Sequence, residues 1–189
     1  MGRLRNLVHL DLSDNYIEGY IPPTLGRLSK LENLNLSSNA LDGNIPPTLC
    51  RLSKLKILNL SSNYLVGNIP PTLGHLTQLT TLTIASNQIN GSIPLEIGNL
   101  NFVQVLDLSR NEIGGSIPST LGHLNRLRSL DLSHNKLVGP IPSSLGHLTQ
   151  LTTLNMYSNQ INGSIPLEIG NLNFLQVLDL SSNKLEGPI

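Results

Sequence analysis

Leucines recur at one fixed spacing along nearly the whole chain. A period of this length, with short hydrophobic stretches separated by turn residues, is typical of a solenoid, whose small units fold only by stacking on one another. The pattern predicts a single domain over residues 1–189, with seven full 24-residue units from Leu4 and a truncated eighth over residues 172–189. The leucines that open the units are Leu4, Leu28, Leu52, Leu76, Leu100, Leu124, Leu148 and Leu172.

Within each unit, the pattern predicts a short strand, a turn and a tight helix. In the sixth unit, Leu130, Asp131 and Leu132 alternate with the period of two that is typical of a strand with one buried face. A glycine and a proline follow in each unit, as at Gly139 and Pro142, and they interrupt any longer helix. The residues that remain suffice for a turn or two of 3-10 helix on the convex side. We therefore expect a β-rich α/β solenoid with a parallel concave sheet.

One asparagine is as regular as the leucines. A side chain that repeats inside a coil meets its copies above and below, and a buried amide is tolerated only when hydrogen bonds satisfy it. We predict an asparagine ladder that binds the backbone of neighbouring units, with a structural rather than a catalytic role. Its members are Asn15, Asn39, Asn63, Asn87, Asn111, Asn135, Asn159 and Asn183.

The repeat unit resembles the plant-type leucine-rich repeat. Residues Leu28 to Leu52 read LSKLENLNLSSNALDGNIPPTLCRL, and the G-x-I-P segment within them marks that subclass. The resemblance covers Leu4 to Ile189. It implies the ectodomain of a plant receptor-like kinase or receptor-like protein, with wall-associated inhibitor proteins as relatives. It also implies a right-handed superhelix, with a second small sheet formed by the G-x-I-P segments.

The same resemblance sets expectations for partners and location. It implies a peptide or protein ligand, a possible co-receptor, and an extracellular position within a plasma-membrane protein. The chain begins with MGRLRNL, with no signal peptide or cysteine-bearing cap, and ends with EGPI inside its eighth unit. We interpret it as an internal fragment, an unusual gene product or an engineered segment. A membrane anchor or a Ser/Thr kinase domain would then lie outside this sequence.

Composition argues against several other functions. The net charge is +0 and aromatic residues make up 3% of the chain, so neither a basic stripe nor a stacking platform favours nucleic acid. No apolar run is long enough to span a bilayer, so we expect no membrane contact by this segment. His75, His123 and His147 share one convex position without acidic or cysteine neighbours, and we expect no metal or other cofactor. Cys50 is the single cysteine and replaces a glycine of the repeat.

Charged residues concentrate on the expected concave face in the fifth and sixth units. With units about 4.8 Å apart, these side chains form a patch of mixed sign that suits the carboxylate and amine ends of a peptide. The alternative is a solvated surface whose charges are locally paired. The candidate binding residues, including one aromatic anchor in the seventh unit, are Asp107, Arg110, Glu112, Arg128, Asp131, His134, Lys136 and Tyr157.

An internal duplication points to the same region. Residues 86–102 and 158–174 are identical, and the two copies lie 72 residues apart. Several differences around them fall on or beside the concave face, including the change from Ala85 to Tyr157. Selection for a ligand and drift at exposed sites both predict this, so the comparison supports the location of a site and not its purpose. An exposed tyrosine in a serine column makes Tyr157 the best single anchor, because aromatic residues are enriched at binding hot spots.

Three alternatives to a recognition module can be weighed from the residues. Asp131, Ser133 and His134 superficially offer catalytic chemistry, but an open curved sheet provides no oxyanion hole, and we expect no enzyme. An inhibitor of a secreted wall-degrading enzyme, similar to polygalacturonase inhibitors, should show an extended acidic face, whereas the charges here are mixed. Ice binding requires a regular Thr or Asn array. Thr83 and the asparagines of the same column hint at one, but Asp107, Asp131 and Asp179 interrupt it. A scaffold without any partner is the remaining alternative.

Overall fold

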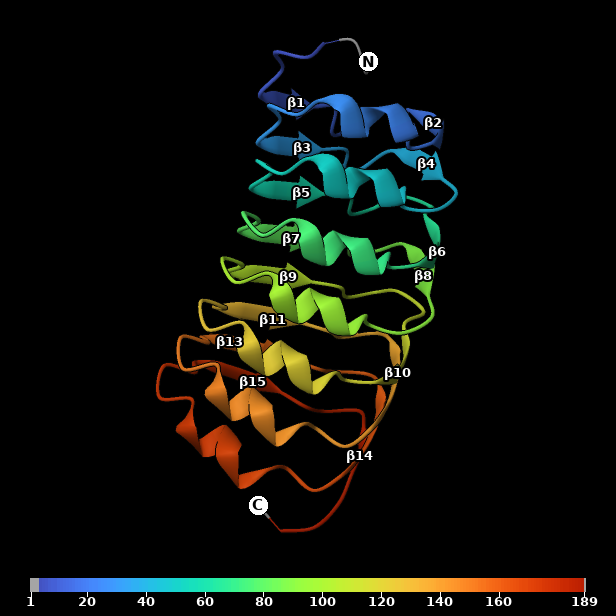
Figure 1. Ribbon diagram of the computed structural model, residues 1–189. Coiled ribbons are helices and arrows are strands. Elements are labelled where there is room, and N and C mark those ends of the chain that lie inside the picture. The colour runs from blue at the N-terminus through green and yellow to red at the C-terminus, as the bar shows by residue number, and fades with distance from the viewer. Residues whose placement is uncertain (1–3, 189) are drawn as a thin grey trace.

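The protein is a stack of similar coils that continues from one end of the molecule to the other (Figure 1). The computed structural model describes residues 4–188, so the first three residues and the last residue of the predicted domain lie outside the described part. Each of the seven full coils combines a strand, a second strand on the far side of the core and a 3-10 helix, and the truncated eighth coil has the two strands. The predicted solenoid of parallel strands and short 3-10 helices is confirmed.

One parallel sheet extends along the whole stack. Equivalent residues of successive units pair with each other, as Leu10 does with Leu34, so each step of this sheet is 24 residues. The outer side of this sheet is the face that the repeat pattern predicts to be concave, and we keep the name concave face for it. In spatial order, the strands are β1 (His9–Asp11), β3 (Asn33–Asn35), β5 (Ile57–Asn59), β7 (Thr81–Thr83), β9 (Val105–Asp107), β11 (Ser129–Asp131), β13 (Thr153–Asn155) and β15 (Val177–Asp179).

A second set of parallel strands follows the ladder asparagines. It consists of two pairs and one four-stranded sheet, linked by single bridges between Asn44 and Val66 and between Ser92 and Gly114. The second sheet implied by the resemblance is therefore present in three pieces. These strands are β2 (Glu18–Tyr20), β4 (Ala40–Asp42), β6 (Val66–Asn68), β8 (Gln88–Asn90), β10 (Gly114–Ser116), β12 (Lys136–Gly139), β14 (Gln160–Gly163) and β16 (Lys184–Leu185).

The two sheets have different registers. In the second set, Tyr20 pairs with Asp42 and Val66 pairs with Gln88, which is a step of 22 residues. Because the step is shorter than the 24-residue repeat, equivalent positions do not face each other on this side. Because the 22-residue step and the 24-residue repeat differ by an even number, a residue that points outward still pairs with one that points outward. Rows of side chains on this face therefore combine different positions of the repeat.

Each of the seven full coils closes with a five-residue 3-10 helix that follows a proline. A Cβ on Gly122 would lie 2.4 Å from the Ser144 carbonyl oxygen, so glycine permits the close stacking of these helices. Cys50 occupies this position in η2 (Pro47–Arg51). Beside it, the hydrogen bond from Thr72 Oγ1 to the Pro47 carbonyl oxygen is 3.3 Å long, whereas the equivalent bonds in three other units are 2.8–2.9 Å long. The helices are η1 (Pro23–Arg27), η2 (Pro47–Arg51), η3 (Pro71–His75), η4 (Leu95–Asn99), η5 (Ser119–His123), η6 (Ser143–His147) and η7 (Leu167–Asn171).

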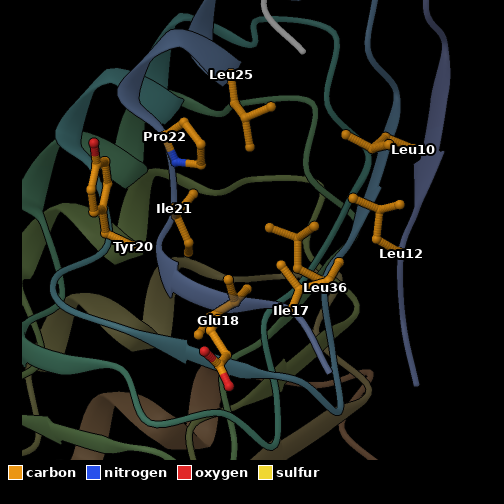
Figure 2. Close-up of a pocket in the computed structure, with 10 residues that line it drawn as sticks. Leu10, Leu12, Ile17, Glu18, Tyr20, Ile21, Pro22, Leu25 and Leu36 are labelled. Atoms are coloured by element: carbon orange, nitrogen blue, oxygen red, sulfur yellow. The ribbon is translucent and has the colours of Figure 1, made fainter. Parts of the chain in front are cut away.

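The leucine core is closed in the middle of the stack and open at its ends. Leu82 and Leu130 are fully buried, whereas Leu178 in β15 is 44% exposed. At the other end, a cavity of about 270 Å³ opens among apolar side chains of the first two units, including Leu10 and Leu36 (Figure 2). This cavity is the uncovered end of the core and contains none of the predicted binding residues.

The regular asparagines connect neighbouring coils. The Asn111 amide donates to the carbonyls of Ile84, Leu108 and Ser109, and its oxygen accepts the Ile89 N–H at 3.0 Å. Side chains that bond the preceding coil in this way are Asn39, Asn63, Asn87, Asn111, Asn135, Asn159 and Asn183. Asn15 is exposed, and its recorded bonds go to carbonyls of its own unit.

We expect Asn111→Leu to lower the free energy of unfolding by about 1–3 kcal/mol, because the buried Ile89 N–H and Ile84 carbonyl lose their partner. Asn15→Leu is the matched control and should cost less, since its side chain bonds no other unit. Urea unfolding followed by circular dichroism measures both changes. Equal losses in the two variants would contradict a role in joining the units.

Candidate functional site

Strands of the concave face end in a side chain that caps the following turn. Asp107 Oδ1 accepts the Ser109 N–H at 3.0 Å, and Asp131 Oδ1 accepts the Ser133 N–H at 2.9 Å. This is the Asx-turn geometry that Asp and Asn favour. The second Asp131 oxygen accepts the Asn155 amide at 3.0 Å. Both predicted aspartates are thus half-buried and already have a structural role.

The turn that follows each of these strands contains a residue in the left-handed conformation. A non-glycine residue there costs roughly 1–2 kcal/mol, and Asp and His tolerate it better than Arg does. Arg110 and His134 both have φ of 52°. Since other residues fit this backbone better than arginine, the Arg110 side chain is a candidate for a functional role. The residues at this position are Asp14, Ser38, Ser62, Ser86, Arg110, His134, Ser158 and Ser182.

Tyr157 lies against a ring of the neighbouring unit. Its ring meets that of His134 edge to face, with centroids 4.9 Å apart and an interplanar angle of 84°. The exposed tyrosine that the serine column predicts is therefore half-buried. The two rings together form an aromatic surface across units six and seven.

Two arginines lie at opposite ends of the strands in this region. Arg110 follows β9 and Arg128 precedes β11, and both are exposed. Within residues 4–188, neither guanidinium forms a salt bridge. Asp107 and Asp131 lie between them as directly paired residues of β9 and β11. The structure therefore retains a mixed-sign patch, with free cations on either side of two aspartates.

Glu112 and Lys136 do not belong to the concave face. Both follow the ladder asparagine of their unit, and Lys136 is the first residue of β12 in the second set of strands. Their side chains form a salt bridge of 3.2 Å and are both exposed. Such a pair contributes about 0–1 kcal/mol. For these two residues the alternative of local pairing holds, because the chain has turned to the second face before it reaches them.

The candidate site is thus reduced to six residues on an open sheet. In the described part of the chain, no three His, Cys, Asp or Glu side chains are grouped closely enough to hold a metal ion. No described helix combines the length and apolarity needed to cross a membrane. The remaining site residues are Asp107, Arg110, Arg128, Asp131, His134 and Tyr157.

Two of the carboxyl groups with lowered pKa values, Asp11 and Asp179, end the first and last strands of the eight-stranded sheet. The Ser13 N–H, followed by the Ser13 hydroxyl and the Asn35 amide, lowers the pKa of Asp11. The Ser181 hydroxyl and then the Ser181 N–H lower the pKa of Asp179. Asp107 and Asp131 form the same kind of capping bond in the middle of the sheet. The bonds of Asp11 and Asp179 therefore stabilise the turns after the first and last strands.

Comparison with family models identifies the repeat. A model described as a leucine-rich repeat region matches residues 72–164. Two further leucine-rich repeat models match residues 1–41 and residues 54–76 and 174–189. The comparison with curated proteins finds no match.

Solved structures of plant proteins have the same fold. One is the ectodomain of the membrane receptor kinase GASSHO1/SCHENGEN3 from Arabidopsis thaliana, in complex with CASPARIAN STRIP INTEGRITY FACTOR 2. It is 43% identical with a TM-score of 0.98, and the match covers 100% of this chain and 23% of the receptor chain. Another is the Arabidopsis receptor kinase HAESA, in complex with the peptide hormone IDA and the co-receptor SERK1. It is 38% identical with a TM-score of 0.94, and the match covers 97% of this chain and 31% of the receptor chain. This chain thus spans less than a third of either receptor chain.

A plant ice-binding protein is also similar. It is 31% identical with a TM-score of 0.76, over 100% of this chain and 68% of its own.

The lowered pKa values of Asp11 and Asp179 predict a loss of stability in acid. A folded pKa below the unfolded value means that each ionised carboxylate stabilises the fold above about pH 4, and that this contribution is lost as the pH falls through and below that value. Carboxyl-detected NMR titration should give midpoints below the ordinary 3.8 for both groups.

Ser181→Ala should move only the Asp179 midpoint towards 3.8, because it removes the bond that lowers this pKa most. The Asp11 midpoint is the internal control. An unchanged Asp179 midpoint in this variant would refute the assigned cause.

Proposed function

This chain belongs to the leucine-rich repeat family, and from that premise we propose that it is a non-catalytic recognition module that binds a peptide or protein segment along its concave face. We further propose that it is part of the extracellular ectodomain of a plant receptor-like kinase or receptor-like protein. Any kinase domain lies outside this sequence. The receptor ectodomains that it resembles are in complex with CASPARIAN STRIP INTEGRITY FACTOR 2 and with the peptide hormone IDA, which supports this function.

The observation that carries the proposal is the free charge of Arg110 and Arg128 around a pair of aspartates. An unpaired guanidinium can hold a ligand carboxylate through two parallel hydrogen bonds. Asp107 and Asp131 lie between the arginines and can attract an amine or a basic side chain. An extended peptide that crosses the strands would meet charges of both signs.

The aromatic pair beside this patch completes the proposed site. The rings of His134 and Tyr157 span two units and provide apolar contact area next to the charged residues. Their mutual contact holds the Tyr157 ring in place before binding, so less side-chain entropy is lost on association. Arg110 has a left-handed backbone, which Asp and His adopt more readily than arginine does. Its presence there costs conformational free energy, which supports a functional role for its side chain.

We expect that a secreted plant peptide found in a binding screen will lose affinity about fivefold or more with Arg110→Ala, Arg128→Ala or Tyr157→Ala, since truncation of a binding hot spot typically costs above 1 kcal/mol. Isothermal titration calorimetry on the folded variants measures the loss. Lys136→Ala is the matched control, because Lys136 is an exposed cation on the other face. Unchanged affinity in all three site variants would show that the site is wrongly placed.

Ice binding is a second candidate, favoured by the similarity to a plant ice-binding protein over all of this chain. Asn35, Asn59 and Thr83 lie in register on neighbouring strands, as an ice-binding array requires. However, the Thr83 hydroxyl donates to Asn59 Oδ1 at 2.8 Å, and Asp107 follows as the next residue of the row. The array is thus short and bonded to itself.

Under the recognition proposal, we expect no thermal hysteresis when ice crystals grow in a solution of this protein. Nanolitre osmometry makes the measurement. A hysteresis gap that Asn59→Tyr abolishes would instead support ice binding, because the larger ring would disrupt the regular row while leaving Arg110 and Tyr157 in place.

A further inference from the structure

Three of the four tyrosines lie on the second face, in the first three units. Tyr16 is 96% exposed, Tyr20 is 69% exposed and Tyr64 is 58% exposed. Figure 2 shows Tyr20 on the opposite side of Ile21 from the leucines of the core. The tyrosines therefore contribute little to the core, and the concave site does not include them.

The 22-residue register brings two of these tyrosines into one row with an acid. Tyr20 pairs with Asp42 between β2 and β4. The Tyr64 N–H donates to the Leu41 carbonyl at 2.8 Å, which places Tyr64 opposite Asp42 on the other side. We call Tyr20, Asp42 and Tyr64 the lateral row. The 24-residue repeat conceals it, because the equivalent of Tyr20 in the next unit is Asn44.

The spacing of the lateral row suits a cation. Strands about 4.8 Å apart place the two tyrosine Cα atoms roughly 10 Å apart, with Asp42 midway between them. A cation interacts with an aromatic face within about 6 Å of the ring centroid, so one that sits over Asp42 is in range of both tyrosines. Asp42 is exposed, and no salt bridge involves it in the described part of the chain.

The charge around the lateral row has one sign. Residues 16–22, 40–46 and 64–70 contain Glu18 and Asp42 and no lysine, arginine or histidine. The corresponding segments of the sixth and eighth units begin with Lys136 and Lys184 and contain no tyrosine. Glu112 and Glu186 also lie in such segments, but Glu112 is paired with Lys136 and Glu186 follows Lys184. Among these segments, an acid without a basic neighbour stands beside tyrosines only in the first three units, where it complements a basic partner.

We propose that the lateral row is a second binding surface, which receives an arginine or lysine side chain from a basic peptide or protein loop. Asp42 forms the charge-assisted hydrogen bond, and the rings of Tyr20 and Tyr64 contact the cation from both sides. Arginine fits best, because its planar guanidinium stacks on aromatic rings and binds a carboxylate with two donors. This surface is separate from the proposed concave site, and the proposal does not depend on that site.

NMR titration of the isotope-labelled chain with the capped peptide acetyl-GRGRG-amide tests the proposal. We expect saturable shift changes centred on Tyr20, Asp42 and Tyr64, and none with acetyl-GEGEG-amide. Asp42→Asn should weaken binding about fivefold, and Tyr20→Ala or Tyr64→Ala roughly threefold each, whereas Tyr20→Phe should keep the affinity because it keeps the ring. All of these side chains are exposed, so the variants should fold.

Two controls distinguish this surface from others. Val138→Ala changes a neutral row of the four-stranded sheet on the same face, formed by Ser116, Val138 and Gln160, and should leave the affinity unchanged. Tyr157→Ala should also have no effect, so a failure of the concave site would not affect this result. Equal affinity of the Asp42→Asn variant, or shift changes centred elsewhere, would overturn the proposal.

Discussion

The buried asparagine carboxamide is the interaction on which the structure depends. It donates to carbonyls of its own coil and of the preceding coil, and its oxygen accepts an N–H from the preceding coil. An amide inside a leucine core is stable only when these bonds are all made, so the ladder permits one spacing of the units. The leucines provide the driving force for burial, but leucine side chains alone would tolerate small shifts. The asparagines fix the position of each coil relative to the next.

Two registers follow from this arrangement and give the molecule two different kinds of surface. On the concave face, equivalent positions of each unit lie in line, so the proposed site consists of substitutions, such as Arg110 or Tyr157, that interrupt a column. On the second face, the 22-residue step brings unlike positions together, as it does for Tyr20 and Asp42. A repeat protein can thus present two surfaces of different composition on its two faces.

Much of the fold could be predicted from the sequence because it follows from period and polarity. The leucine spacing predicts parallel strands and short helices, and the recurring asparagine indicates a buried amide. The capping by Asp107 and the left-handed backbone at Arg110 were missed, although the recurring Asp, Asn and Ser at these positions are the residues that such turns favour. The repeat pattern predicts Lys136 on the concave face, whereas it begins β12 in the second set of strands, because the leucine period does not tell where the chain turns. The 22-residue register depends on the path of the chain across the core, which no single repeat encodes.

The most direct test of the central claim is hydrogen exchange of the backbone N–H groups that donate to the side-chain oxygens of the ladder asparagines. The N–H groups of Leu41, Leu65, Ile89 and Ile113 each donate to a ladder asparagine of the following unit at 3.0 Å, outside the ladders of the eight-stranded sheet. The account predicts that they exchange as slowly as the amides of the central strands, because both open only when units separate. Exchange at the rate of exposed turn amides would show that the carboxamides do not join the coils.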